Sequence, residues 1–161
     1  MQLLPNGIGG LMMSTDLIHG KVRGDFVQKM GYPAWFPTVL GLFKLTQACL
    51  NWVSDGAMVP YAQFLMAFQL GGAAFTHSVI EGKSFLSGQI PVCVFFASTV
   101  AIQLLHGNID SPPIVLGLHG LLFALGFGSG YVIFALGAGR SQLAAGRSIS
   151  PVKWRKQRGF S

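Results

Sequence analysis

Hydrophobic residues are gathered along this chain into long runs, and short polar stretches separate the runs. A helix needs about 20 apolar residues to cross the ~30 Å hydrocarbon core of a bilayer. Three runs meet this standard without a formal charge, over residues 60–80, 85–105 and 113–137. A fourth run, over residues 36–53, carries one charge, Lys44. The pattern predicts a transmembrane helix in each of these runs.

A fifth run, over residues 3–18, is shorter and more polar than the others. It contains one proline and three glycines and ends near Asp16. The sequence therefore predicts an all-α protein, an integral membrane bundle of four to five transmembrane helices. The number depends on whether residues 3–18 span fully.

The polar stretches between the runs are short and rich in turn-forming residues. Residues 54–59, 81–84 and 106–112 hold Gly, Asp, Asn, Ser and Pro between them, and these residues favour turns. Helices joined by such short connections must run antiparallel to their neighbours. Only the first connection, over residues 19–35, is longer.

The composition agrees with a chain that lipid surrounds. Charged residues make up only 10% of it, whereas a soluble domain carries about 25%. If every run crosses the membrane, all Lys and Arg residues except Lys44 fall on one side, and Asp55 and Asp110 fall on the other. This is the positive-inside pattern. It places the C-terminal tail on the cytoplasmic, stromal or matrix side of a bacterial plasma, thylakoid or mitochondrial inner membrane.

Residues 140–161 form a basic tail after the predicted bundle of residues 1–139. The tail carries the excess positive charge of the chain, whose formal net charge is +6. One interpretation is a solvated anchor at an anionic membrane surface, worth about 1 kcal/mol per basic residue. The other is a peptide that docks on an acidic neighbouring subunit. We expect no nucleic-acid binding, because the charge follows the topology and not a folded reading face.

Small and polar residues recur at helical spacing on one face of the 60–80 run. They are Gln69, Gly72, Ala73, Thr76 and His77. In lipid, small residues let helices approach closely and polar residues hydrogen-bond across the contact. One interpretation is therefore a packed helix seam in which His77 bonds to a neighbour. The alternative is a proton relay or a cofactor ligand, because polar residues within membranes often mark function.

The 113–137 run carries a second stripe, formed by His119, Gly126, Gly130 and Gly137. Steps of seven, four and seven residues place all four near one line along a helix. Gly126 and Gly130 also match the small-x-x-x-small pattern of helix association. The stripe predicts a packing face toward this bundle or a partner subunit. The alternative is that His119 ligates a haem or chlorophyll whose ring fills the space beside the glycines.

Asp16 and Lys44 are the only formal charges inside the predicted spans. Lys44 can extend to the basic side or pair with Asp16, and a charge within a membrane is a functional hypothesis by default. The chain shows no Ser/His/Asp set, no H-E-x-x-H motif and no C-x-x-C motif. We therefore predict no catalytic residue and no metal site.

The stretch M-G-Y-P-A-W-F, continued by V-L-G-L-F-K-L-T-Q-A, resembles DoxX-like membrane proteins. In that family a G-K pair closes the first helix and a G-Y-P turn follows it. The second helix then begins with a glycine and carries a charged residue. The matching residues here are 20–21, 31–33, Gly41 and Lys44.

Later residues extend this resemblance. The stretch G-G-A-A-F-T-H and the following Q-I-P are similar to the third and fourth helices of the family. The resemblance covers about residues 3–105, so the 113–137 run is an extra helix. It implies either a partner of quinone- or thiol-linked oxidoreductases or an assembly chaperone for membrane proteins.

These observations favour a non-catalytic accessory or assembly subunit of a larger membrane complex, of an electron-transfer or photosynthetic kind. Two small-residue helix faces and a basic tail offer attachment surfaces. The alternative is a small quinone- or haem-linked redox membrane protein that uses His77 or His119. The expected partners are the lipid bilayer and other membrane subunits, and the two histidines are where a chlorophyll or haem contact is expected.

Overall fold

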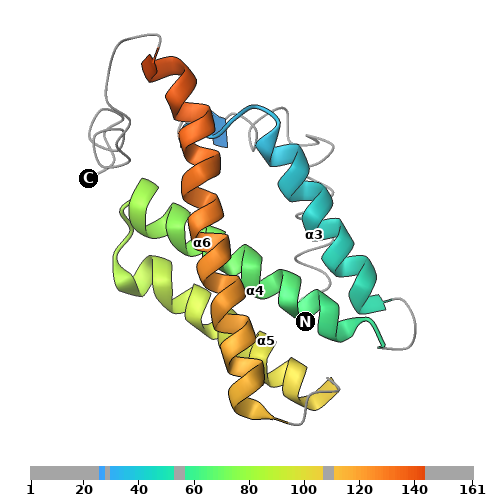
Figure 1. Cartoon of the computed structure of the whole chain (residues 1–161). Helices are drawn as coiled ribbons and strands as arrows, with labels where there is room; N and C mark the ends of the chain where they lie inside the picture. Colours follow the sequence, from blue (N-terminus) through green and yellow to red (C-terminus); the bar gives the residue numbers. More distant parts are fainter. Residues whose placement is uncertain (1–25, 28–29, 53–56, 107–110, 144–161) are drawn as a thin grey trace.

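The protein is described here by a computed structural model, which covers residues 26–27, 30–52, 57–106 and 111–143 (Figure 1). These residues form helices joined by turns. The helical elements within them are α3 (Phe36–Trp52), α4 (Val59–Phe75), η3 (Thr76–Ile80), η4 (Phe85–Gln89), α5 (Ile90–His106) and α6 (Pro112–Leu143). The two η elements are π turns, of which η3 continues α4 and η4 leads into α5.

The prediction of an all-α chain is confirmed for the described residues. The helices begin and end within a few residues of the predicted hydrophobic runs, except that α6 continues past residue 137 to Leu143. The predicted first span, residues 3–18, and most of the 19–35 connection lie outside the described residues. So do Asp16, Asp55, Asp110 and the tail from residue 144 onward.

Prolines stand at or near the starts of these helices. Pro60 lies in the first turn of α4, where its missing N–H group would have had no helical partner. Pro91 is the second residue of α5, and the π turn η4 ends immediately before α5. The Ile90 N–H group bonds back to the Phe85 carbonyl, five residues away. The chain thus enters α5 through a π turn directly before Pro91.

Two of the described helices are long and apolar enough to cross a membrane, judged by length and composition. They are Phe85–His106 and Pro112–Gly137. The helix over residues 59–80 does not meet this criterion, although the sequence predicts a span there. Its polar residues, including Gln63, Gln69 and His77, lower its mean hydropathy. α3 has 17 residues and contains Lys44.

α4 lies at the centre of the described bundle. It packs against α3 and α5, and its most extensive contact is with α6, which crosses it in Figure 1. Glycines bring the two backbones together at this crossing. A Cβ atom on Gly126 would overlap the Phe68 carbonyl, and one on Gly71 would overlap the Phe123 carbonyl. Only residues without a side chain fit these two positions.

The other small residues named in the sequence lie along the same region. A Cβ atom on Gly130 would stand 2.9 Å from a ring carbon of the buried Phe75. One on Gly137 would overlap the Gly31 carbonyl, in the turn before α3. Gly72 is less crowded, because its Cβ position lies 3.6 Å from the Gly126 carbonyl oxygen. Ala73 packs beside the core between α4 and α5.

Apolar packing is concentrated in two clusters. One cluster holds Tyr32, Phe75, Ile80 and Phe134, all buried, where the turn before α3 meets the ends of α4 and α6. The second cluster joins α4 to α5 through Met66, Leu70, Ala74 and Val92. The outward sides of α5 and α6 are also apolar, but they remain exposed. Their large exposed residues include Val94, Phe95, Leu105, Ile114, Leu116, Leu121, Leu125 and Val132.

Candidate functional site

A cavity of about 310 Å³ lies between α3, α4 and α6. Its walls are mainly apolar and include Phe36 and Leu40 from α3, Ala73 from α4 and Ile133 from α6. Gly72 is also part of the wall, and small residues at these α4 positions leave room that larger side chains would fill. We call this space the apolar cavity.

One flank of the apolar cavity is open. Trp35 and Val39 line it, yet their side chains are 48% and 50% exposed. Deeper along α3, the rings of Phe43 and Phe68 meet with centroids 6.0 Å apart. Both residues also line the cavity. The space is therefore reached from the outer side of α3.

A pair of hydroxyl groups lies at one end of the apolar cavity. The Tyr32 hydroxyl is 2.7 Å from Thr76 Oγ1, and the Thr76 hydroxyl donates to the Gly72 carbonyl at 2.9 Å. Since the Thr76 proton is used in the second bond, Tyr32 donates in the first. Burial raises the pKa of Tyr32 to about 12. The phenol therefore stays protonated and acts as a donor throughout the neutral range.

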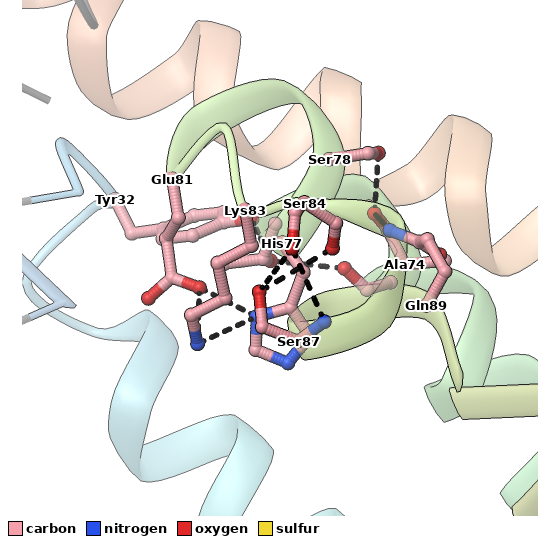
Figure 2. A network of polar contacts seen from close by, with 11 residues as sticks. Tyr32, Ala74, His77, Ser78, Glu81, Lys83, Ser84, Ser87 and Gln89 are labelled. Atoms are coloured by element: carbon pink, nitrogen blue, oxygen red, sulfur yellow. Dashed lines mark hydrogen bonds and ion pairs between the residues drawn. The ribbon is translucent and has the colours of Figure 1, made fainter. Parts of the chain in front are cut away.

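A charged cluster lies beside this end, where η3 meets the following turn (Figure 2). The His77 Nδ1 atom is 2.5 Å from a Glu81 carboxylate oxygen, and Lys83 Nζ is 2.9 Å from the same oxygen. Lys83 Nζ also lies 3.3 Å from His77 Nδ1. The hydrogen bond from His77 lowers the pKa of Glu81 against the opposing effect of burial, and Lys83 adds to the lowering.

The backbone around this cluster brings its members together. The Lys83 N–H group donates to the His77 carbonyl at 2.9 Å, and Gly82 between them adopts a φ of 64°. A positive φ of this size suits glycine, which has no Cβ atom to clash. The Ser84 side chain then accepts from the Ser87 N–H group at the start of η4. His77 also lines the apolar cavity, so the cluster lies at its edge.

Lys44 and Gln69 line the apolar cavity on the side away from Tyr32. Lys44 is partly buried, and within the described part of the chain its ammonium group meets no hydrogen-bond acceptor. The Gln69 Oε1 atom is buried and likewise has no partner there. Asp16, the partner that the sequence offers for Lys44, lies outside the described residues.

His119 lies apart from the apolar cavity, in the first half of α6. It is fully buried, and its ring stands 5.1 Å from that of Phe64 and 6.3 Å from that of Phe96. Its Nδ1 atom bonds to the Val115 carbonyl at 2.9 Å, which leaves Nε2 as the free acceptor of a neutral imidazole. The structure thus brings His77 to the cavity and places His119 at the contact of α4, α5 and α6.

His119 belongs to a group of fully buried polar side chains at one end of the bundle. The group, called the buried polar group below, consists of Gln47, Gln63, Thr99, Gln103 and His119. Each of these residues lies in the half of its helix that is farther from Tyr32. Gln63 donates to Asn51 at 3.2 Å. Atoms of all these residues except Thr99 nevertheless lack a protein hydrogen-bond partner in the described part.

Two parts of this arrangement were not predicted from the sequence. Glu81 and Lys83 were expected only as part of the 81–84 connection, although His77 and Glu81 have the i, i+4 spacing that lets side chains meet on a helix. Tyr32 was expected only as part of a motif. The bond between Tyr32 and Thr76 joins residues 44 positions apart, and no local pattern reports such a contact.

The described residues contain no group of three or more His, Cys, Asp or Glu side chains that could hold a metal ion. The geometry offers an apolar cavity with polar side chains at both ends. No protein-family model, curated protein or solved structure matches the chain. The resemblance to DoxX-like proteins therefore stays a prediction from the sequence.

Proposed function

We propose that this chain is an integral membrane protein and acts as a non-catalytic accessory or assembly subunit of a larger membrane complex. The observation that carries the proposal is the outward surface of α5 and α6. The continuous helix Phe85–His106, made of η4 and α5, and the Pro112–Gly137 part of α6 are long enough to span, and only 17% of the most apolar window of each is buried within the bundle. Apolar surface of this extent on a soluble monomer would be an aggregation hazard, whereas lipid or another membrane helix covers it without cost.

A second small-residue stripe on α6 supports the subunit role. Gly120, Ala124 and Gly128 recur every four residues and are exposed. A Cβ atom on Gly120 or Gly128 would meet nothing within 4 Å. Small residues at this spacing let membrane helices approach closely. The stripe therefore leaves α6 able to receive a helix from a partner on the side away from α4.

The proposal includes the topology and attachment surfaces that the sequence predicts. The basic tail lies on the cytoplasmic, stromal or matrix side and adds a second point of contact with the complex. The narrower expectation of an electron-transfer or photosynthetic complex stays a prediction.

The test is co-migration with a complex that depends on the outer stripe of α6. The tagged chain, expressed in its native host and extracted in mild detergent, is expected to migrate well above its own 17.2 kDa on native gels. Gly128→Leu should release it as a free protein, and Ala101→Leu, at an exposed position on α5, should not. Free migration of the unaltered chain would contradict the subunit role.

A second candidate function is a small quinone- or haem-linked redox protein. The observation that favours it is the place of His77 at the edge of an apolar cavity. An absorption spectrum of the purified protein tests this candidate directly. A stoichiometric Soret band, or a bound quinone, that His77→Ala abolishes would place the redox function ahead of the subunit role.

A further inference from the structure

The Lys44 side chain brings a cation to an apolar cavity. Among the described residues, no side chain or carbonyl group makes a hydrogen bond to its ammonium group. Lys44 is only partly buried, and its apolar surroundings make an anion at hydrogen-bond distance a favourable partner for its ammonium group. A cavity with this lysine in its wall is therefore suited to an anion.

Gln69 strengthens the same end of the cavity. The contact between Phe43 and Phe68 joins α3 to α4 at this depth, and Lys44 and Gln69 are the next residues along each helix. The Gln69 Oε1 atom is buried without a partner. Rotation of the amide by 180° presents its NH₂ group in place of the oxygen. Gln69 can then donate to the anion that Lys44 binds, and bonds to a charged acceptor are the stronger kind.

The rest of the cavity is suited to a hydrocarbon chain. From Gln69 to Thr76 the wall runs for seven residues of helix, about 10 Å. Ala73 belongs to this stretch, and Phe36 and Leu40 of α3 line the same cavity. A volume of about 310 Å³ lies at the lower limit of small-molecule sites, which favours one chain over two. The open flank beside Trp35 and Val39 lets a longer chain extend out of the bundle.

We propose that the apolar cavity binds a single-chain acidic amphiphile, such as a long-chain fatty acid. Its carboxylate lies on Lys44 and Gln69, and its chain follows the apolar wall toward Phe36. The inference goes beyond the subunit role and rests on the cavity alone, so either can fail without the other.

The test uses the full chain in a non-ionic detergent and palmitate as the probe, at a pH where the carboxylate is ionised. We expect one palmitate to bind per chain in equilibrium dialysis. Hexadecanol has the same chain length without the charge, and it should bind at least tenfold more weakly. This comparison uses the unaltered protein and does not depend on the folding of a variant.

Variants then locate the site. Lys44→Met should weaken palmitate binding at least tenfold, whereas Lys44→Arg should keep most of it. Ala73→Leu should block the site by filling the wall. Ala97→Leu makes the same change at an exposed position of α5 and should have no effect. Elution as a single symmetrical peak in size-exclusion chromatography shows which variants are folded.

Three results would overturn the proposal. Equal binding of palmitate and hexadecanol would mean apolar partition without recognition of the head group. A short-chain benzoquinone that displaces palmitate and binds Lys44→Met as well as the unaltered chain would make the cavity a quinone site. Palmitate binding that is absent from the unaltered chain and appears only in Asp16→Asn would assign the Lys44 ammonium to an internal partner.

Discussion

The two sides of α6 carry similar small residues but meet different surroundings. On the inner side, Gly126 touches the backbone of α4 so closely that a Cβ atom has no room. On the outer side, Gly120 and Gly128 follow the same four-residue spacing and meet nothing within 4 Å. The spacing alone therefore does not tell whether a glycine closes the bundle or remains available. The atoms that lie opposite a glycine decide which of these two roles it has. The substitutions below test this difference between the inner and outer sides of α6.

Gly126→Leu should have the largest effect on stability. Its side chain would overlap the Phe68 carbonyl and force α4 and α6 apart. We expect a loss of about 3 kcal/mol or more, at the upper end of the cost of overpacking a core. Denaturation in mixed micelles measures it. An unfolding midpoint equal to that of the unaltered protein would mean that α4 and α6 do not cross at this glycine.

Leu125→Lys tests whether the outer side faces lipid. Leu125 is adjacent to Gly126 in sequence but is 53% exposed. A lysine near the centre of a spanning helix raises the apparent insertion free energy by about 3 kcal/mol. A glycosylation-based insertion assay of the helix measures this quantity. Unchanged insertion would place residue 125 near an interface or in water.

Gly130→Leu should have a moderate effect. Its Cβ position lies 2.9 Å from the buried Phe75 ring, so the ring must move for the side chain to fit. We expect a loss of about 1–3 kcal/mol, typical of overpacking against a side chain. Leu122→Phe is the control, because Leu122 is only partly buried. Equal, mild effects of both substitutions would mean that the inner stripe does not close the bundle.

Gly128→Leu should have the smallest effect on the isolated bundle. Nothing stands near its Cβ position, so the free energy of unfolding should change by less than about 0.5 kcal/mol, as is usual for surface substitutions. The same denaturation measurement serves here. A loss as large as that of Gly130→Leu would show that the outer side already contacts another part of the chain.

The helices of this fold could be predicted because hydrophobic runs and prolines mark them locally. The 85–105 run becomes a continuous helix from Phe85 to His106, and Pro112 and Pro113 begin α6 close to the predicted start. Which small residues would face inward could not be derived from the period alone. Gly126 and Gly128 are only two positions apart, yet they lie on nearly opposite sides of a helix.

The candidate site was harder to predict than the helices. His77, Lys44 and Gly72 are recognisable one by one, as polar or small residues in apolar runs. The apolar cavity that they share depends on how α3, α4 and α6 are packed, and this packing joins residues far apart in sequence. The separation of His119 from His77 has the same origin, since both are histidines in predicted spans but face different helix contacts.

The two π turns beside the 81–84 connection have a consequence for insertions and deletions. In a π turn the hydrogen bond reaches one residue further than in an α-helix, so each turn acts as one inserted residue. In η3 the Glu81 N–H group accordingly bonds to the Thr76 carbonyl at 2.9 Å. Deleting one residue there would restore the α-helical phase and rotate Glu81 by about 100° relative to α4. The polar end of the cavity thus depends on residue count as well as on residue identity.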